Sequence, residues 1–513
     1  YATHPFGLEP RVPPYFTFAI AQVLSGRMAV HRILSLIFHL ACVFSLYKLV
    51  YDLLRRTAQP DATGSTFHAQ RDAAVWAFIA SAVFAIHPVA VYGAGYLIQR
   101  TIVLATLFSL LSLILFARGL TLGRYADALS AALMFSIAVL CKEHSVLIPA
   151  VALLAVPLLA AERRFSIRYS LLYLSACAPA GIFLLLLRKG VIGGAYEPEF
   201  GRVAAQIGGA FGDQVATSPL SVSAVTQAGL FFKYLSLWLW PDTRAMSVDI
   251  RIDFLESWSP GWMVLKVSAF VAFGVLGTLL LRRRGRLGLV GFGMLYTWVL
   301  FLVEFSAARI QEPFVLYRSY LWGPGILLAG AALLNGVPRR VAFPACALAC
   351  AVLFYQARDR LESFSSPLAL WQDAVAKFPA KPVPWGSRVL FNLARAYAYD
   401  QRLDKSAEVA ERCLAEYPDT YDCYFARGAI YLQAGEYDLA RRYLARAIAL
   451  KPESGIAHHR LGIVLENLGR IDEAKALYRR AFELGYGGAK QELMRLESPG
   501  SGLSPPRKTT RAR

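Results

Sequence analysis

Long apolar runs fill the first 358 residues of this chain, and they constrain its fold more than any other feature. Of the 513 residues, 56% are hydrophobic and only 17% are charged. A soluble protein usually has an apolar fraction of ~45–50%, with about a quarter of its residues charged. The excess excludes an ordinary soluble enzyme, a coiled coil and a disordered chain. It predicts an all-α, polytopic membrane protein.

Apolar stretches of ~17–25 residues are long enough to cross a bilayer as helices. A shorter stretch, Ala228 to Trp240, stops at Pro241 and is interpreted as a partial or re-entrant helix. The sequence predicts ten spans, at residues 29–54, 73–92, 101–118, 126–141, 144–160, 169–188, 262–281, 288–305, 319–335 and 341–357.

Arginine clusters occupy every second connection between these spans. The net charge of +19 would otherwise raise the question of nucleic acid. The positive-inside rule places the clusters in the cytoplasm, and it puts residues 1–28 and everything after 358 outside. We therefore expect an inner-membrane protein that binds no nucleic acid. The clusters are Arg55, Arg56 and Arg71; Arg118 and Arg124; Arg163, Arg164 and Arg168; Arg282, Arg283, Arg284 and Arg286; and Arg339 and Arg340.

A period of 34 residues appears after hydropathy falls at Tyr355. Ala394, Gly428 and Gly462 follow one another at this interval. The period is typical of the tetratricopeptide repeat, a helix–turn–helix unit. Stacked repeats form concave surfaces that fit a protein or peptide partner, although a plain spacer is the alternative. The predicted domains are an outer segment 1–28, a transmembrane domain 29–358, an extracytoplasmic repeat domain 359–497 and a disordered basic tail 498–513.

The repeat domain contains two of the seven cysteines, Cys413 and Cys423. They are able to pair in an oxidising compartment. Because Cys413 stands at a small-residue position of the repeat, packing as a small hydrophobe is the favoured interpretation. No CxxC or HxxxH spacing occurs, so the sequence predicts no metal site.

Polar residues also gather at the predicted membrane boundaries. His31, Ser35 and His39 form a stripe on one helix, which favours hydrogen bonding between helices. Placing an ionisable residue near a membrane costs free energy, so such residues at the outer surface are interpreted first as functional. Arginine and lysine there suit a lipid-linked phosphate, and a carboxylate suits a general base. Loop-fixing ion pairs, Lys142–Glu143 and Arg318–Glu312, are the alternative. The outer residues are His87, Tyr96, Gln99, Arg100, Lys142, Glu143, His144, Glu304, Arg309, Glu312, Arg318 and Tyr320.

Several ordered segments resemble the transmembrane-and-tetratricopeptide-repeat (TMTC-like) protein O-glycosyltransferases and their bacterial relatives. The matching segments are RVPPYFTFAIAQVLSG, HPVAVYGAGYLIQR, CKEHSVLIPAVALL, FKYLSLWLWPDTRAMSVDI, EPFVLYRSYLWGPG and ALWQDAVAKFP. The resemblance covers nearly the whole chain, and the order of the segments makes it more specific than any one of them.

The resemblance implies a C-type glycosyltransferase (GT-C) fold. Such an enzyme takes a sugar from a polyprenyl-phosphate carrier and attaches it to Ser or Thr of an extracytoplasmic protein, which the repeats recruit. The resemblance does not identify a cofactor, and it leaves open whether the enzyme needs a divalent metal. At the matching positions, side-chain chemistry assigns phosphate or substrate binding to Arg100, Lys142, Arg318, Gln99 and Tyr320, and catalytic roles to Glu143 and His87.

Two departures from the family pattern affect this assignment. The family's first outer loop, which carries an acidic catalytic residue, should precede Arg11, where Glu9 is the sole carboxylate. The catalytic Asp therefore belongs to an absent upstream segment, or it has been lost. Tyr317 stands where the family has a histidine, so no histidine role transfers.

Two other functions compete with the enzyme. A missing acidic loop beside an intact repeat array favours a non-catalytic membrane anchor that scaffolds a larger complex. A transporter is the third hypothesis, but only one partial helix, 228–240, resembles the broken helices that transporters use.

Overall fold

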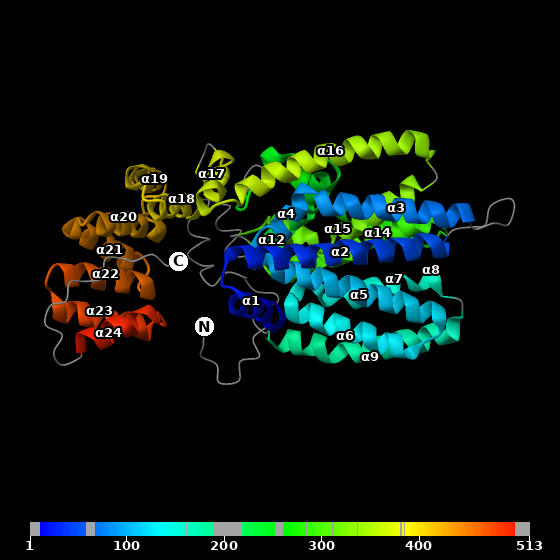
Figure 1. Ribbon diagram of the computed structural model, residues 1–513, viewed down its shortest axis with the longest axis horizontal. Helices are drawn as coiled ribbons and strands as arrows, with labels where there is room; N and C mark the ends of the chain where they lie inside the picture. The colour runs from blue at the N-terminus through cyan, green and yellow to red at the C-terminus, as the bar shows by residue number, and fades with distance from the viewer. Residues whose placement is uncertain are drawn as a thin grey trace. The chain divides into compact units, whose positions relative to one another are not determined.

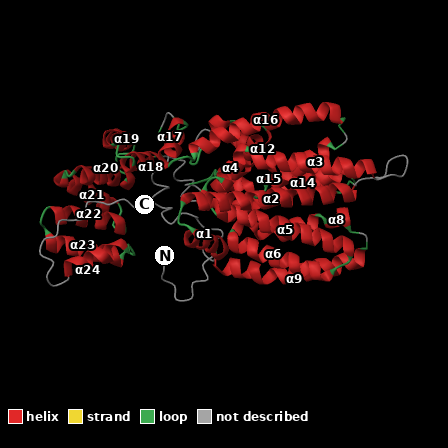
Figure 2. Ribbon diagram, in the orientation of Figure 1, coloured by secondary structure: helices red, strands yellow, loops and turns green. Residues whose placement is uncertain are grey.

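The computed structural model describes residues 11–57, 67–160, 162–187, 218–251, 260–283, 285–309, 312–335, 337–379, 382–383 and 385–497. The chain divides into two compact units, Tyr1–Ser365 and Ser366–Arg513. Figure 2 shows helices and loops throughout the described part, where the only β-pairing is an isolated bridge, Asn335–Val337. The all-α prediction is therefore confirmed for this part of the chain. Outside it lie Glu9, Arg284, most of the 189–225 loop and the tail 498–513.

Unit 1 is a bundle of helices that run side by side along the long axis of Figure 1. Its 3₁₀ segments are labelled η. The elements are α1 (Val12–Leu24), α2 (Met28–Thr57), α3 (Phe67–Ile86), α4 (Pro88–Ala94), η1 (Leu97–Gln99), α5 (Arg100–Leu122), α6 (Tyr125–Cys141), η2 (Glu143–Leu147), α7 (Ile148–Leu154), α8 (Val156–Leu159), α9 (Arg163–Leu187), α12 (Pro219–Leu239), η3 (Thr243–Ala245), α13 (Pro260–Leu281), α14 (Arg286–Phe301), η4 (Leu302–Ser306), η5 (Leu316–Tyr320), α15 (Gly323–Leu334) and α16 (Arg339–Ser363).

Six helices among the described residues are long and apolar enough to cross a membrane. A seventh is added if the pair Arg71–Ile86 and Pro88–Ala94, bent by 64°, counts as one span. The prediction of ten spans is therefore wrong. The six are Met28–Thr57, Leu97–Leu122, Arg163–Leu187, Gly261–Leu281, Arg286–Ser306 and Arg339–Ser363.

Two of the missing spans are interrupted by breaks in the backbone that hydropathy does not register, and the third, 126–141, is one short unbroken helix. Three predicted spans, 126–141, 144–160 and 319–335, correspond to apolar helices of no more than 17 residues. The second is interrupted where α7 and α8 each begin with a proline in the first turn, as proline favours. Conversely, α12 has 21 residues and begins at Pro219, so the partial helix predicted at 228–240 is too short.

Glycines allow neighbouring helices of unit 1 to approach closely. A Cβ atom at Gly293 of α14 would lie 2.5 Å from the carbonyl oxygen of Gly325 on α15. A Cβ at Gly323 would lie within 2.8 Å of three ring atoms of Trp238, from α12. Small residues at helix contacts are typical of membrane bundles, where packing replaces the hydrophobic effect as the driving force.

The arginine clusters join helix ends at one end of unit 1. Arg118 at the end of α5 pairs with Asp127 at the start of α6 (Nη2–Oδ1 2.6 Å). Arg339 at the start of α16 pairs with Asp72 of α3. Further contacts join the end of α2 to the end of α5, and the start of α14 to the end of α15; they are Arg56–Thr121 and the Arg286–Asn335 carbonyl. The outer residues named above lie on the opposite ends of these helices.

Unit 2 is an array of helix pairs whose small residues recur with the predicted period. A Cβ at Gly428 would lie 2.7 Å from Leu444, and one at Gly462 would lie 2.7 Å from Tyr478. A larger side chain at either position would clash with the paired helix, which explains why small residues recur. The helices are α17 (Pro367–Ala376), α18 (Ser387–Tyr399), α19 (Leu403–Glu416), α20 (Tyr421–Ala434), α21 (Tyr437–Leu450), α22 (Gly455–Asn467), α23 (Ile471–Glu483) and α24 (Gly488–Glu497).

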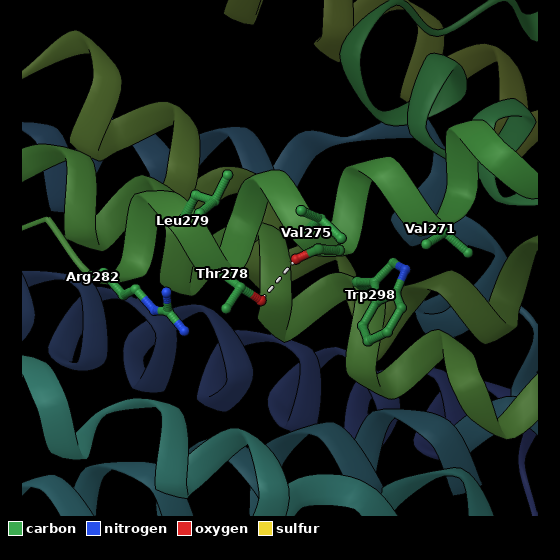
Figure 3. Close-up of a pocket in the computed structure, with 7 residues that line it drawn as sticks. Val271, Val275, Thr278, Leu279, Arg282 and Trp298 are labelled. Carbon is green, nitrogen blue, oxygen red and sulfur yellow. Dashed lines mark hydrogen bonds between the residues drawn. The ribbon is translucent and has the colours of Figure 1, made fainter.

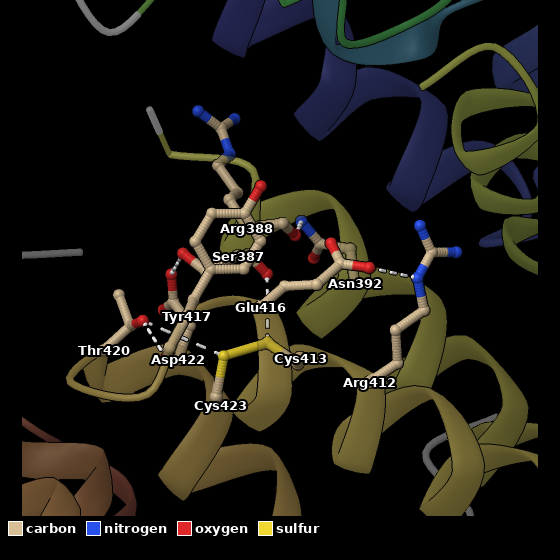
Figure 4. Close-up of a disulfide and its surroundings, with 10 residues drawn as sticks. All are labelled: Ser387, Arg388, Asn392, Arg412, Cys413, Glu416, Tyr417, Thr420, Asp422 and Cys423. Carbon is tan, nitrogen blue, oxygen red and sulfur yellow. Dashed lines mark hydrogen bonds and ion pairs between the residues drawn. A yellow bond between two sulfur atoms is a disulfide. The ribbon is translucent and has the colours of Figure 1, made fainter. Parts of the chain in front are cut away.

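A disulfide joins two helices of unit 2 (Figure 4). Cys413 of α19 and Cys423 of α20 are bonded, with a Cα–Cα distance of 5.4 Å, and both are fully buried. The favoured interpretation, a packed free thiol at the small-residue position, is therefore wrong about the thiol, although the side chain does pack there. The other five cysteines are free, and all five lie in unit 1.

Candidate functional site

A buried carboxylate, Glu304, is the centre of a charged cluster at the ends of the unit 1 helices opposite the arginine clusters. Its side chain is fully buried at the end of α14, in η4. Its Oε2 lies 2.9 Å from Nε of Arg309 and accepts a hydrogen bond from Nη1 of Arg318 at 3.1 Å. Its Oε1 lies 3.2 Å from Nε2 of His144. Three separate segments therefore converge on one carboxylate.

The segments that meet at Glu304 follow the ends of helices. After α6 ends at Cys141, Lys142 is extended, and a short 3₁₀ turn, η2, carries Glu143 and His144. Similarly, α14 tightens into η4 and then becomes extended at Ala307. Such 3₁₀ turns commonly finish helices, and here they turn the backbone so that its charged side chains meet.

Helix α12 fixes the segment that follows η4. Ser223 Oγ accepts the backbone N–H of Arg309 at 2.9 Å, and Gln227 Nε2 donates to the Pro313 carbonyl at 2.8 Å. The Tyr234 hydroxyl accepts from the Val315 N–H at 2.8 Å and lies 3.0 Å from its carbonyl. Since buried backbone groups require partners, these bonds allow a non-helical segment to be buried there.

A second carboxylate, Glu143, lies beside the first. Its Oε1 is 3.6 Å from Nη2 of Arg11 and 4.0 Å from Nδ1 of His144. Lys142 is buried, with its Nζ 5.6 Å from the ring centroid of Tyr317. One of the two predicted loop-fixing pairs takes a different form: Arg318 pairs with the Glu304 side chain and donates to the backbone carbonyl of Glu312.

The described cluster carries one more positive than negative charge when His144 is neutral. Its four cations, on Arg11, Lys142, Arg309 and Arg318, face three carboxylates, on Glu143, Glu304 and Glu312. Burial disfavours the Arg318 guanidinium, but the adjacent Glu304 carboxylate outweighs it and holds the pKa of Arg318 above its ordinary value. Arg318 is therefore charged at any physiological pH. A local surplus of cations favours an anion.

Arg100 lies elsewhere, in a separate junction of α1, α2 and α5. Its guanidinium is fully buried and donates to Ser35 Oγ at 3.1 Å, Thr17 Oγ1 at 3.2 Å and the His31 carbonyl at 2.8 Å. It also lies 4.1 Å from the ring centroid of Phe18. Gln99 precedes it in η1. The polar stripe of α2 thus makes the hydrogen bonds between helices that its spacing predicts.

The side chains of His87 and Tyr320 also contact other parts of the fold. His87 caps α4, where its Nδ1 accepts the Val89 N–H at 3.2 Å, and its Nε2 lies 3.1 Å from the Trp238 carbonyl. The imidazole stacks on the Trp238 ring at 4.4 Å. Tyr320 is fully buried, and its hydroxyl lies 2.7 Å from Nδ1 of His39. Of the seven predicted site residues, the structure brings Lys142, Glu143 and Arg318 together.

The prediction assigned no role to Glu304, Arg309 or His144, although all three stand among the outer residues. A carboxylate at the end of the apolar run 288–305 is the signal that could have singled out Glu304, because such residues are rare and costly. The described residues contain no group of three or more His, Cys, Asp or Glu able to hold a metal ion.

Two family models match unit 2, and both are described as tetratricopeptide repeat. They cover residues 388–420 and 425–487. Together with the 34-residue period, these matches identify the C-terminal unit as tetratricopeptide repeats. Such arrays serve protein–protein interaction through their extended surfaces. Among curated proteins, none matches this chain.

Several solved structures are similar to parts of the chain. The first tetratricopeptide repeat domain of Spaghetti (RPAP3), bound to the HSP90 peptide SRMEEVD, is 21% identical with a TM-score of 0.22, over 23% of this chain and 95% of that one. A mutant of MamA is 28% identical with a TM-score of 0.22, over 25% and 73%. The MamA MSR-1 C2 structure is 26% identical with a TM-score of 0.21, over 31% and 82%.

Proposed function

We propose that this chain is an integral membrane glycosyltransferase of the C type. It moves a sugar from a polyprenyl-phosphate carrier to a Ser or Thr of an extracytoplasmic protein, and its repeats recruit that acceptor. One observation supports the proposal most strongly. The cation-rich cluster around Glu304 lies at the end of unit 1 opposite the arginine clusters, where a lipid-linked phosphate would meet it.

The proposed chemistry assigns separate roles to the two carboxylates. The acceptor hydroxyl oxygen attacks the anomeric carbon of the sugar, and the bond from that carbon to the carrier phosphate breaks. Glu143 accepts the hydroxyl proton as general base. Lys142 and Arg318 stabilise the charge that develops on the departing polyprenyl phosphate. Glu304 holds Arg309 and Arg318 in place.

Sidedness has two supports. The arginine-rich connections gather at one end of unit 1, which the positive-inside rule assigns to the cytoplasm. The Cys413–Cys423 disulfide in the repeats is typical of an oxidising compartment. Both features favour an inner-membrane protein whose repeats lie on the extracytoplasmic, periplasmic side.

A transfer assay tests the proposed activity. The full-length gene product is incubated with a polyprenyl-phosphate sugar and co-purified periplasmic proteins, and sugar bound to protein is measured. We expect Lys142→Gln to lower kcat/KM by ~100-fold or more. Lys48→Gln is the matched control, because Lys48 forms a half-exposed pair with Asp52 on α2. Full activity of the Lys142→Gln protein would refute the phosphate role.

A non-catalytic scaffold is the second candidate, and a specific observation favours it. Arg100, His87 and Tyr320, three of the predicted site residues, are occupied by neighbours of the fold. Transfer by the wild-type chain excludes this candidate. If the wild type transfers no sugar, while its repeats still retain a periplasmic protein, the scaffold is the correct function.

A further inference from the structure

A groove of about 320 Å³ lies along α13 and α14, and its lining shares no residue with the Glu304 cluster. Figure 3 shows its side chains, with Val271, Val275 and Leu279 from α13 and Trp298 from α14. Gly274 lets the Trp298 ring pack directly against α13, because a Cβ there would lie 2.6 Å from the ring. The two residues meet in the lining of the groove.

The lining presents almost no polar atom to an occupant. The Thr278 hydroxyl donates to the Gly274 carbonyl at 2.9 Å, within α13. The Trp298 indole N–H donates to the Phe270 carbonyl at 3.0 Å. Since these polar groups are satisfied inside the protein, what remains for contact is apolar. Such a surface suits a hydrocarbon chain.

Within the described chain, the groove side of α13 is largely open. Val271, Val275 and Leu279 are each exposed over about half of their surface. Only 22% of the apolar window of Gly261–Leu281 is buried. Both α13 and α14 are among the six candidate spans, so in a membrane this face meets lipid.

Arg282 closes one end of the groove with a positive charge. It is exposed, and it belongs to the arginine-rich end of unit 1. From Val271 to Arg282 the helix rises ~16 Å, at ~1.5 Å per residue. One leaflet of a bilayer core has nearly the same depth, about half of ~30 Å. The apolar length of the groove matches one acyl chain, and the charge of Arg282 at its end matches one lipid headgroup.

We propose that this groove is a specific site for an anionic phospholipid, with one acyl chain against Trp298 and Gly274 and the phosphate at Arg282. This site lies at the arginine-rich end of unit 1, opposite the proposed lipid-phosphate site around Glu304, and the two sites share no residue. It would take lipid from the cytoplasmic leaflet, where anionic lipids attract basic residues. Charge complementarity at Arg282 selects this occupant over a neutral lipid.

Native mass spectrometry of the full chain, purified from membranes in mild detergent, tests the proposal. The protein is titrated with phosphatidylglycerol or phosphatidylcholine, and bound lipid is counted. We expect a saturable site with several-fold preference for phosphatidylglycerol. Arg282→Gln should weaken phosphatidylglycerol binding about fivefold, corresponding to ~1 kcal/mol for one basic residue. Arg283→Gln, an exposed neighbour outside the lining, should change it by less than twofold.

A second pair of variants tests the acyl half of the site without changing charge. Val275→Trp fills the groove and should abolish the saturable site, whereas Leu276→Trp, on another exposed position of α13, should retain it. Equal binding of both lipids overturns the proposal, as does an equal effect of Arg282→Gln and Arg283→Gln. So does a protein dimer that Val275→Trp dissociates, since the occupant is then a second copy. Recovery of the chain outside the membrane fraction also overturns it.

Discussion

Removing the charge of Glu304 is the sharpest test of the cluster, since Glu304→Gln keeps the shape of the side chain. Glu304 is fully buried, with two guanidinium groups at 2.9 and 3.1 Å. Both Arg309 and Arg318 are also buried and would lose their shared carboxylate. Breaking a buried ion pair typically costs ~3–5 kcal/mol, mostly because the remaining charge has no compensation. We expect a loss of stability in this range.

Thermal unfolding of the purified full chain in mild detergent measures this loss. A cost of ~3–5 kcal/mol should lower the apparent Tm by roughly 4–10 °C. Glu362→Gln is the matched control. It removes a carboxylate from the Arg358–Glu362 pair, in which both side chains are about 70% exposed. Exposed pairs contribute ~0–1 kcal/mol, so the control should remain close to the wild type.

A double variant separates charge from packing. Glu304→Gln with Arg318→Gln leaves one buried guanidinium instead of two, and it should be more stable than the sum of the single changes predicts. Additive effects would mean that the two side chains do not interact. A Glu304→Gln protein as stable as the Glu362→Gln control would refute the buried cluster altogether.

Four further outcomes are expected. Arg100→Met should cost ~2–4 kcal/mol through lost buried hydrogen bonds while leaving the KM for the donor unchanged; a raised KM would restore its phosphate role. Burial lowers the pKa of His459 from 6.5 to about 4, so repeat stability should fall as pH drops from 6.5 towards 4, and His459→Leu should flatten this dependence in pH-dependent melting. Alkylation of the unfolded chain should leave Cys413 and Cys423 unlabelled until reduction, and replacing both with Ser should cost ~2–3 kcal/mol in the same melts. Glu143→Gln should abolish transfer with little change in Tm.

The repeat domain was predictable because its signal is local and discrete. Gly428 and Gly462 must be small, since each faces a large side chain of the paired helix, Leu444 or Tyr478. This need for a small residue appears in the sequence as glycine or alanine every 34 residues. The number of membrane spans was not predictable in this way, because hydropathy reports composition and not backbone continuity. The bend of 64° after Ile86 interrupts an apolar run that reads as one helix.

The candidate site was predictable in part, and for a related reason. Sequence order places a residue at a helix end, but it does not give the direction in which that end faces. Lys142, Glu143 and Arg318 meet because η2 and η5 both turn toward η4. Arg100 stands at an equivalent helix end but faces α1 and α2 instead. There it donates hydrogen bonds to the Thr17 hydroxyl and the His31 carbonyl. The polar stripe of α2 predicts hydrogen bonds between helices, but it does not show that Arg100 is the partner.

The two carboxylates of the cluster differ in burial, and this difference bears on the proposed mechanism. Glu304 has three close basic partners and no exposed surface, so protonating it would leave two buried arginines uncompensated. A general base must release and regain a proton in each cycle, which makes Glu304 unsuitable. Glu143 has a longer contact, 3.6 Å to Arg11, and a side chain that is 13% exposed. The proposed mechanism therefore gives the general-base role to Glu143, while Glu304 keeps the arginines in position. Under the proposed mechanism, the cluster would contain one carboxylate that holds arginines in place, Glu304, and one that serves as general base, Glu143.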